Sequence, residues 1–202
     1  MSFKLSGIKV TVSYPAVAML CLALFTSYNG DVMIPLCLLA CVLHESGHLL
    51  FICKFIGKPH SITIKPGEVC INCNTSDVSF KQEQIITCAG VAFNFTTSLI
   101  SYMFYSFVPI SICLDFAICN LCIGIFNLLP VRTFDGGQLI YNALLRKYSL
   151  KATEIVTNIL TVLIVIPLAT AGFYILLISK FNYTLLIVAI YTVSIIITKE
   201  MR

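Results

Sequence analysis

Long apolar runs separated by short polar stretches make up most of the sequence. A helix needs about 20 apolar residues to cross the hydrocarbon core of a membrane, and these runs approach or reach that length. We therefore predict an all-α polytopic membrane protein, with residues 1–202 forming a single intramembrane domain. The six predicted spans are residues 8–28, 33–56, 85–108, 110–129, 152–178 and 181–198.

The segment between the second and third spans has a different pattern. Apolar and polar residues alternate in Ser61–Ile64 and again in Val69–Cys73, with Pro66-Gly67 between them. Alternation on both sides of a Pro-Gly turn is typical of a β-hairpin. We predict a small interfacial hairpin, whose exposed edge can receive an extended substrate by strand addition. A short hairpin without that role is the alternative.

The composition is that of a membrane protein, and the positions of the basic residues indicate its orientation in the membrane. Hydrophobic residues make up 58% of the chain and charged residues 11%, whereas a soluble domain has about 25% charged residues. If the N-terminus is cytoplasmic, Lys180 is the only one of the 13 basic residues on the outer side. This asymmetry follows the positive-inside rule and predicts that both termini are cytoplasmic. The net charge of +4 is thereby explained by membrane orientation, and no nucleic-acid partner is expected.

The ten cysteines do not form the framework of a secreted protein. Most lie inside apolar runs, where cysteine acts as a small hydrophobic residue. Cys70 and Cys73 form one C-x-x-C pair, but no second pair follows with the spacing of a zinc ribbon, so their function stays open.

The second span contains His44, Glu45 and His48 in the pattern H-E-x-x-H. On a helix, positions four residues apart share a face, so both imidazoles can reach one metal ion. Glu45 is then placed to take the proton from a water molecule that the metal activates. Ionisable groups are expensive inside a membrane and usually serve a function there. The alternative is three buried polar groups satisfied by their neighbours.

The depth of the histidines limits the choice of a third ligand. His44 lies about 16 Å below the start of its span, at 1.5 Å per residue, so the metal lies in the cytoplasmic half of the membrane. Asp135 follows Pro130, which breaks the inner end of the fourth span, and is the first candidate. His60, in the interfacial loop, is the second. Two histidines and a carboxylate leave one zinc position open for water.

Two asparagines inside apolar spans are candidates to stabilise the oxyanion of an amide hydrolysis. They are Asn94 in the third span and Asn127 in the fourth. The alternative for each is an interhelical packing hydrogen bond. Gly90 shares a helix face with Asn94, and a small residue there permits close approach of another helix.

These motifs together resemble the site-2 protease family of intramembrane zinc metalloproteases, which pairs H-E-x-x-H with N-x-x-P-x-x-x-x-D-G. The second motif is matched by Asn127 to Gly136, and Gly90 to Asn94 resembles the family's central G-P-x-x-N element with Val91 in place of proline. The small six-span form is similar to the stage IV sporulation FB branch. The resemblance implies Zn²⁺ held by His44, His48 and Asp135, with Glu45 as the catalytic base.

The resemblance also implies a membrane-associated protein substrate, such as a membrane-tethered sigma-factor precursor or an anti-sigma factor. We expect a bacterial cell or forespore membrane as the location, with the lipid bilayer and a regulatory membrane protein or a second copy of the chain as further partners. One alternative is a membrane metal carrier or transporter, because histidine and aspartate at mid-membrane are also transport ligands. Transport does not require the base Glu45, and no internal repeat is evident. The other alternative is a catalytically inactive scaffold.

Overall fold

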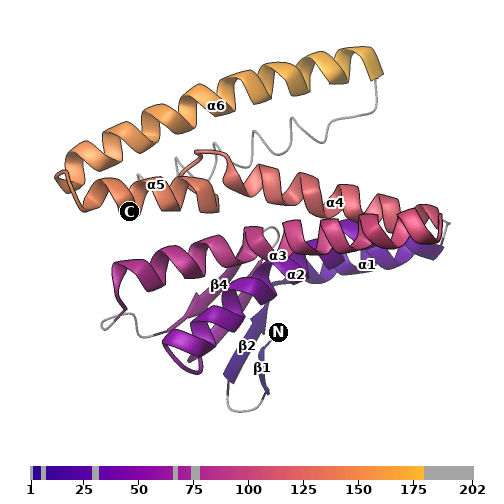
Figure 1. Cartoon of the computed structure of the whole chain (residues 1–202), viewed down its shortest axis with the longest axis horizontal. Helices are drawn as coiled ribbons and strands as arrows, with labels where there is room; N and C mark the ends of the chain where they lie inside the picture. Colours follow the sequence, from indigo (N-terminus) through magenta and orange to yellow (C-terminus); the bar gives the residue numbers. More distant parts are fainter. Residues whose placement is uncertain (1, 6–7, 29–31, 66–67, 74–77, 180–202) are drawn as a thin grey trace. The chain divides into compact units, whose positions relative to one another are not determined.

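The computed structural model describes residues 2–5, 8–28, 32–65, 68–73 and 78–179 (Figure 1). The chain divides into two compact units, residues 1–125 and residues 126–202, and each is described by itself. The predicted sixth span, residues 181–198, lies outside the described residues.

The first unit contains a four-stranded sheet in the order β1-β2-β3-β4. The strands are β1 (Ser2–Leu5), β2 (Ile8–Val12), β3 (Ser61–Lys65) and β4 (Glu68–Asn72). The antiparallel pair β3-β4 is the hairpin that the alternating pattern predicted. The strand β2 pairs in parallel with β3, so residues 8–12 form a strand and the first helix begins later than predicted.

Three complete helices and most of a fourth belong to the first unit. They are α1 (Tyr14–Tyr28), α2 (Met33–Phe55), α3 (Phe80–Phe107) and α4 (Ser111–Leu128), whose last turn enters the second unit. The helices α2 and α3 run side by side (Figure 1). The helix α3 begins five residues before the predicted span because Ser79 and Gln82 form a capping box at its N-terminus.

The second unit contains α5 (Asp135–Leu145), α6 (Leu150–Ser179) and the loop that leads from α4 to α5. Val131 of this loop is buried against Val165 of α6. A Cβ atom added to Gly136 or Gly137 would collide with the backbone carbonyls of Leu128 and Val131, respectively. The two glycines therefore allow α5 to start directly against the loop.

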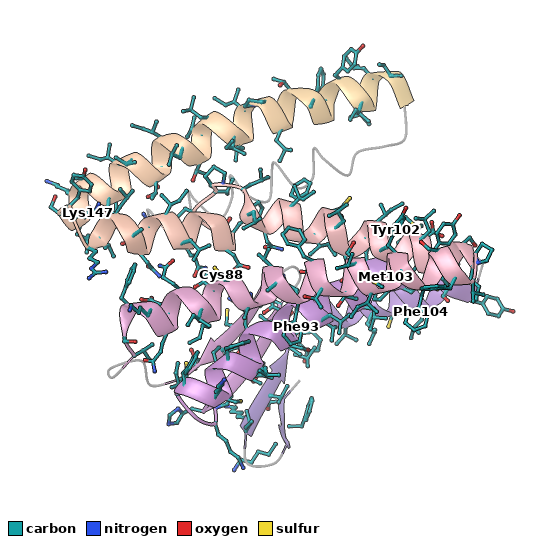
Figure 2. The ribbon with its side chains drawn as sticks, viewed as in Figure 1. Cys88, Phe93, Tyr102, Met103, Phe104 and Lys147 are labelled. Carbon is teal, nitrogen blue, oxygen red and sulfur yellow. The ribbon has the colours of Figure 1, made fainter. Side chains whose placement is uncertain are left out.

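Buried and exposed positions are reversed relative to a soluble protein. The large, fully buried side chains include two asparagines and three threonines. They are Asn94, Asn120, Thr153, Thr157 and Thr161. Exposed positions are mostly apolar, such as Tyr102, Met103 and Phe104, which point away from the ribbon near the end of α3 (Figure 2). Such a surface suits contact with lipid, because apolar side chains are well solvated by lipid tails.

Four of the described helices are long and apolar enough to cross a membrane. They cover Met33–Phe55, Phe80–Phe107, Ser111–Leu128 and Leu150–Ile178, which correspond to the second to fifth predicted spans. The helix α1 has 15 residues and is shorter. The prediction of a helical, polytopic membrane protein with a small β element is therefore confirmed, and the chain is an integral membrane protein.

Candidate metal centre

His44 and His48 lie on one face of α2, as their spacing predicted. Their Nε2 atoms are 3.1 Å apart, and the planes of the two rings are inclined at 80°. Two nitrogen ligands at 2.0–2.1 Å from a tetrahedral zinc ion would be separated by about 3.3 Å. The spacing of the two imidazoles therefore suits a shared zinc ion.

Hydrogen bonds determine which ring nitrogen of His44 carries the proton. His44 Nδ1 is 2.6 Å from Asn94 Oδ1. The Asn94 amide nitrogen donates to the carbonyl of Ala40 and to Asn120 Oδ1. Because the carbonyl of Ala40 can only accept, Asn94 must direct its Nδ2 there and its Oδ1 toward His44. His44 therefore donates through Nδ1, so the lone pair of a neutral His44 ring is on Nε2.

The same argument applies to His48. Its Nδ1 lies 2.8 Å from the backbone carbonyl of Ile86, which is an acceptor only, so Nδ1 must donate. In two neutral rings the lone pairs would then be on the Nε2 atoms, which lie 3.1 Å apart. Metal-binding histidines commonly donate their second nitrogen in this way.

The backbone of α3 passes close to the two imidazoles. A Cβ atom added to Gly90 would collide with His48 Nε2 and lie 2.8 Å from His44 Cε1. A Cβ atom added to Gly47 of α2 would lie 2.7 Å from the carbonyl oxygen of Ala89. The two glycines let α2 and α3 approach closely at the level of the ligand atoms. There is thus no room for a methyl group on α3 beside the imidazoles.

Glu45 and Asn94 occupy different positions around the histidines. Glu45 follows His44 on α2 and is half-buried. Asn94 is fully buried, and both hydrogens of its amide are donated to neighbouring oxygen atoms. This arrangement favours the packing alternative for Asn94 and gives it a role that the sequence did not suggest, which is to orient His44.

In the second unit, Asp135 is buried at the first turn of α5. Backbone N–H groups at a helix N-terminus stabilise a carboxylate, so the position suits an ionised aspartate. Asn127 is half-buried in the last turn of α4. His60 belongs to the first unit and is exposed, and its backbone N–H donates to the carbonyl of Asn72 in the sheet.

The loop before Asp135 is fastened to α6 through Arg132, a contact that the sequence did not reveal. The backbone N–H of Arg132 donates to Thr161 Oγ1 at 3.0 Å. The guanidinium donates to Thr157 Oγ1 at 3.4 Å and lies 3.6 Å from a Glu154 carboxylate oxygen. It also stacks over the ring of Tyr141 at 4.4 Å. These contacts hold the loop rigidly within the second unit, and Asp135 with it.

Three comparisons show which known proteins the chain is similar to. Residues 108–167 match Peptidase family M50. The zinc metalloprotease MJ0392 of Methanocaldococcus jannaschii is 26% identical over 197 residues, which cover 90% of this chain and 57% of that protein. The solved structure of a site-2 protease from the same organism superposes with a TM-score of 0.64 at 21% identity, covering 95% of this chain and 92% of the solved chain.

In its helical membrane fold and its paired-histidine motif the chain is similar to these zinc metalloproteases. The resemblance to the site-2 protease family that the motifs predicted is confirmed by the family match, the curated relative and the fold. Zinc, the predicted cofactor, is the metal of this class, and the donor pair of α2 fits it. The chain spans a little over half the length of its curated relative.

Proposed function

We propose that this protein is a zinc-dependent intramembrane endopeptidase that cleaves a membrane-associated regulatory protein within or near its transmembrane segment. The observation that carries the proposal is the pair of imidazoles on α2, whose Nε2 atoms lie 3.1 Å apart with both Nδ1 atoms donating to oxygen acceptors. Such a pair beside a half-buried glutamate in a membrane-length helix is suited to hydrolysis and not only to metal binding.

His44 and His48 would hold the zinc ion together with Asp135. The support for Asp135 is its match to the second family motif and its burial at the start of α5, directly after the loop that Arg132 joins to α6. Zinc, when bound, polarises the substrate carbonyl and makes a water molecule more acidic. The carboxylate of Glu45 would accept the proton of that water and later deliver it to the leaving amine. Asn127 remains the candidate donor to the developing oxyanion.

The sheet offers a way to present an extended substrate. A peptide bond inside a helix is shielded by its own hydrogen bonds, so the substrate must unwind before it is cut. The strand β4 lies at the edge of the sheet, and an edge strand can accept an extended segment through its free backbone groups. The similarity of the motifs to the stage IV sporulation FB branch supports a sigma-factor precursor or anti-sigma factor as substrate.

The same resemblance supports a bacterial cell or forespore membrane as the location. The distribution of basic residues supports cytoplasmic termini, which place the histidines in the cytoplasmic half of the membrane. A regulatory membrane protein or a second copy of the chain would be a further partner.

The substitution Glu45→Gln tests the chemistry. The amide keeps the size of the side chain but cannot accept the proton of the water, so zinc should remain bound and cleavage should be lost. The measurement is zinc per protein together with cleavage of a co-expressed membrane-tethered substrate. Glu83→Gln is the matched control, because Glu83 is exposed at the start of α3 and should be silent.

The outcome also separates the alternatives. Cleavage that continues in Glu45→Gln would refute the role of this residue as base. Zinc binding by the wild type without cleavage of any tethered substrate would favour the inactive scaffold, and zinc uptake into vesicles would favour the carrier.

A further inference from the structure

The Asn94 amide that holds His44 is itself held by a second asparagine. Asn120 of α4 is fully buried, and its Oδ1 accepts a hydrogen bond from Asn94 Nδ2 at 3.0 Å. Its own amide nitrogen donates to the carbonyl of Phe116 at 2.9 Å. His44, Asn94, Asn120 and Phe116 therefore form one chain of hydrogen bonds through α2, α3 and α4, within the first unit.

The direction of every bond in this chain is determined at its ends. The carbonyl of Phe116 can only accept, so Asn120 must direct its amide nitrogen there and its Oδ1 toward Asn94. Asn94 must then direct its nitrogen to Asn120 and its oxygen to His44. His44 is left to donate through Nδ1, so the lone pair of a neutral His44 ring is on Nε2.

Reversing the Asn94 amide would be unfavourable for two reasons. Its oxygen would face two acceptors, the carbonyl of Ala40 and Asn120 Oδ1, and its nitrogen would force His44 to accept through Nδ1 and carry its proton on Nε2. All of these groups lie in a low-dielectric interior, where unmatched polar groups are costly. Without Asn120, one of the two acceptors that disfavour the reversed amide would be lost.

We infer that Asn120 is a positioning residue for the metal centre, which acts through Asn94 on the tautomer and orientation of His44. The inference rests on the proposed function, because it assigns Asn120 to the zinc site of that function. Asn120 is not part of the Gly90-to-Asn94 motif of α3. In the chain of hydrogen bonds it contacts Asn94 and Phe116, not the histidines.

The test compares three variants of the full-length protein in detergent. Asn120→Ser removes the carboxamide, and α4 should tolerate it because Ser46, Thr87 and Thr96 already bond the carbonyl four residues earlier in their own helices. Asn120→Asp, as a neutral carboxylic acid, can accept from Asn94 and donate to Phe116. Ser98→Ala is the control, since Ser98 bonds the carbonyl of Ala117 across the same pair of helices but does not lead to His44.

The readouts are the affinity for Zn²⁺ by chelator competition, the visible absorption spectrum with Co²⁺ in its place, and thermal melting. Substitutions of residues that support metal ligands typically lower the metal affinity about 10- to 100-fold. We expect a loss of about tenfold for Asn120→Ser, because Asn120 is one hydrogen bond further from His44 than Asn94 is. The Co²⁺ spectrum of Asn120→Ser should also change, and Asn120→Asp should have the wild-type metal affinity and spectrum. Ser98→Ala should lower the melting temperature without changing the metal affinity.

Two results would overturn the inference alone. One is an unchanged affinity and Co²⁺ spectrum in Asn120→Ser, and the other is an equal loss of affinity in Ser98→Ala, which would mean that helix packing in general supports the site. A wild-type protein that binds neither metal would overturn the proposed function and this inference together.

Discussion

A methyl group added at Gly90 tests the close contact between α3 and the two histidines. The added Cβ would collide with His48 Nε2 and lie 2.7 Å from His48 Cε1 and 2.8 Å from His44 Cε1. Real Cβ contacts are essentially never shorter than 3.0 Å, so either the rings or the helix must move. The rings are also held by hydrogen bonds to Asn94 and to the carbonyl of Ile86, one turn after and one turn before Gly90 on α3, which leaves them little freedom.

The size of the effect follows from the strain. Inserting a methyl group into a well-packed interior costs about 1–3 kcal/mol. We take this strain to act mainly on the zinc-binding arrangement, in which both Nε2 atoms reach one ion. Because 1.4 kcal/mol corresponds to a tenfold change in affinity, the zinc affinity should fall about 5- to 150-fold. Gly90→Ala should therefore lose zinc and activity together, while most of the protein remains folded.

The assay is zinc affinity by chelator competition on detergent-purified protein, with thermal melting measured on the same samples. Gly124→Ala is the control, because its Cβ would lie 2.6 Å from Phe95 Cε1 and 3.4 Å from the Cβ of Asn94, and its three nearest atoms belong to Phe95 and Asn94 and not to an imidazole. It should show comparable overpacking and nearly normal zinc affinity. Wild-type zinc affinity in Gly90→Ala would refute the placement of α3 against the ligand atoms.

Two further predictions concern the third ligand and the orientation in the membrane. Asp135→Ala should reduce zinc per protein and cleavage, because two imidazoles are too few for a stable site, whereas His60→Ala should leave both nearly unchanged; the reverse result would make this a three-histidine site. Single cysteines introduced into a cysteine-depleted protein near Lys65 and Arg146 should react only with a permeant reagent in intact cells, and one near Lys180 with an impermeant reagent as well. The opposite labelling would invert the proposed orientation.

The parts of the site that depend on local spacing could be predicted from the sequence. The four-residue separation of His44 and His48 was sufficient to place both imidazoles on one face of α2. Alternation around Pro66-Gly67 was sufficient for the hairpin. Both patterns reflect the geometry of a single element or of two neighbouring strands.

The parts that depend on distant pairings could not be predicted. The sequence predicts a membrane span from residue 8, where the structure has the strand β2. Its partner β3 follows about 50 residues later, and no local pattern indicates a parallel pairing across that distance. The bond from Asn120 to Asn94 and the bond from Arg132 to Thr161 likewise join different helices. Composition indicates that such polar side chains need partners inside a membrane, but not which ones.

The parallel pairing of β2 with β3 also limits how the chain can be threaded through the bilayer. The strand β2 directly precedes α1, and β3 follows α2, yet four residues of each strand lie in register with each other. The two strands must therefore lie on the same side of the membrane, and the number of crossings between them must be even. If α2 crosses once, as its length allows, the 15-residue helix α1 has to supply the second crossing. This parity holds whichever side faces the cytoplasm, and α2 cannot be inverted without breaking the sheet.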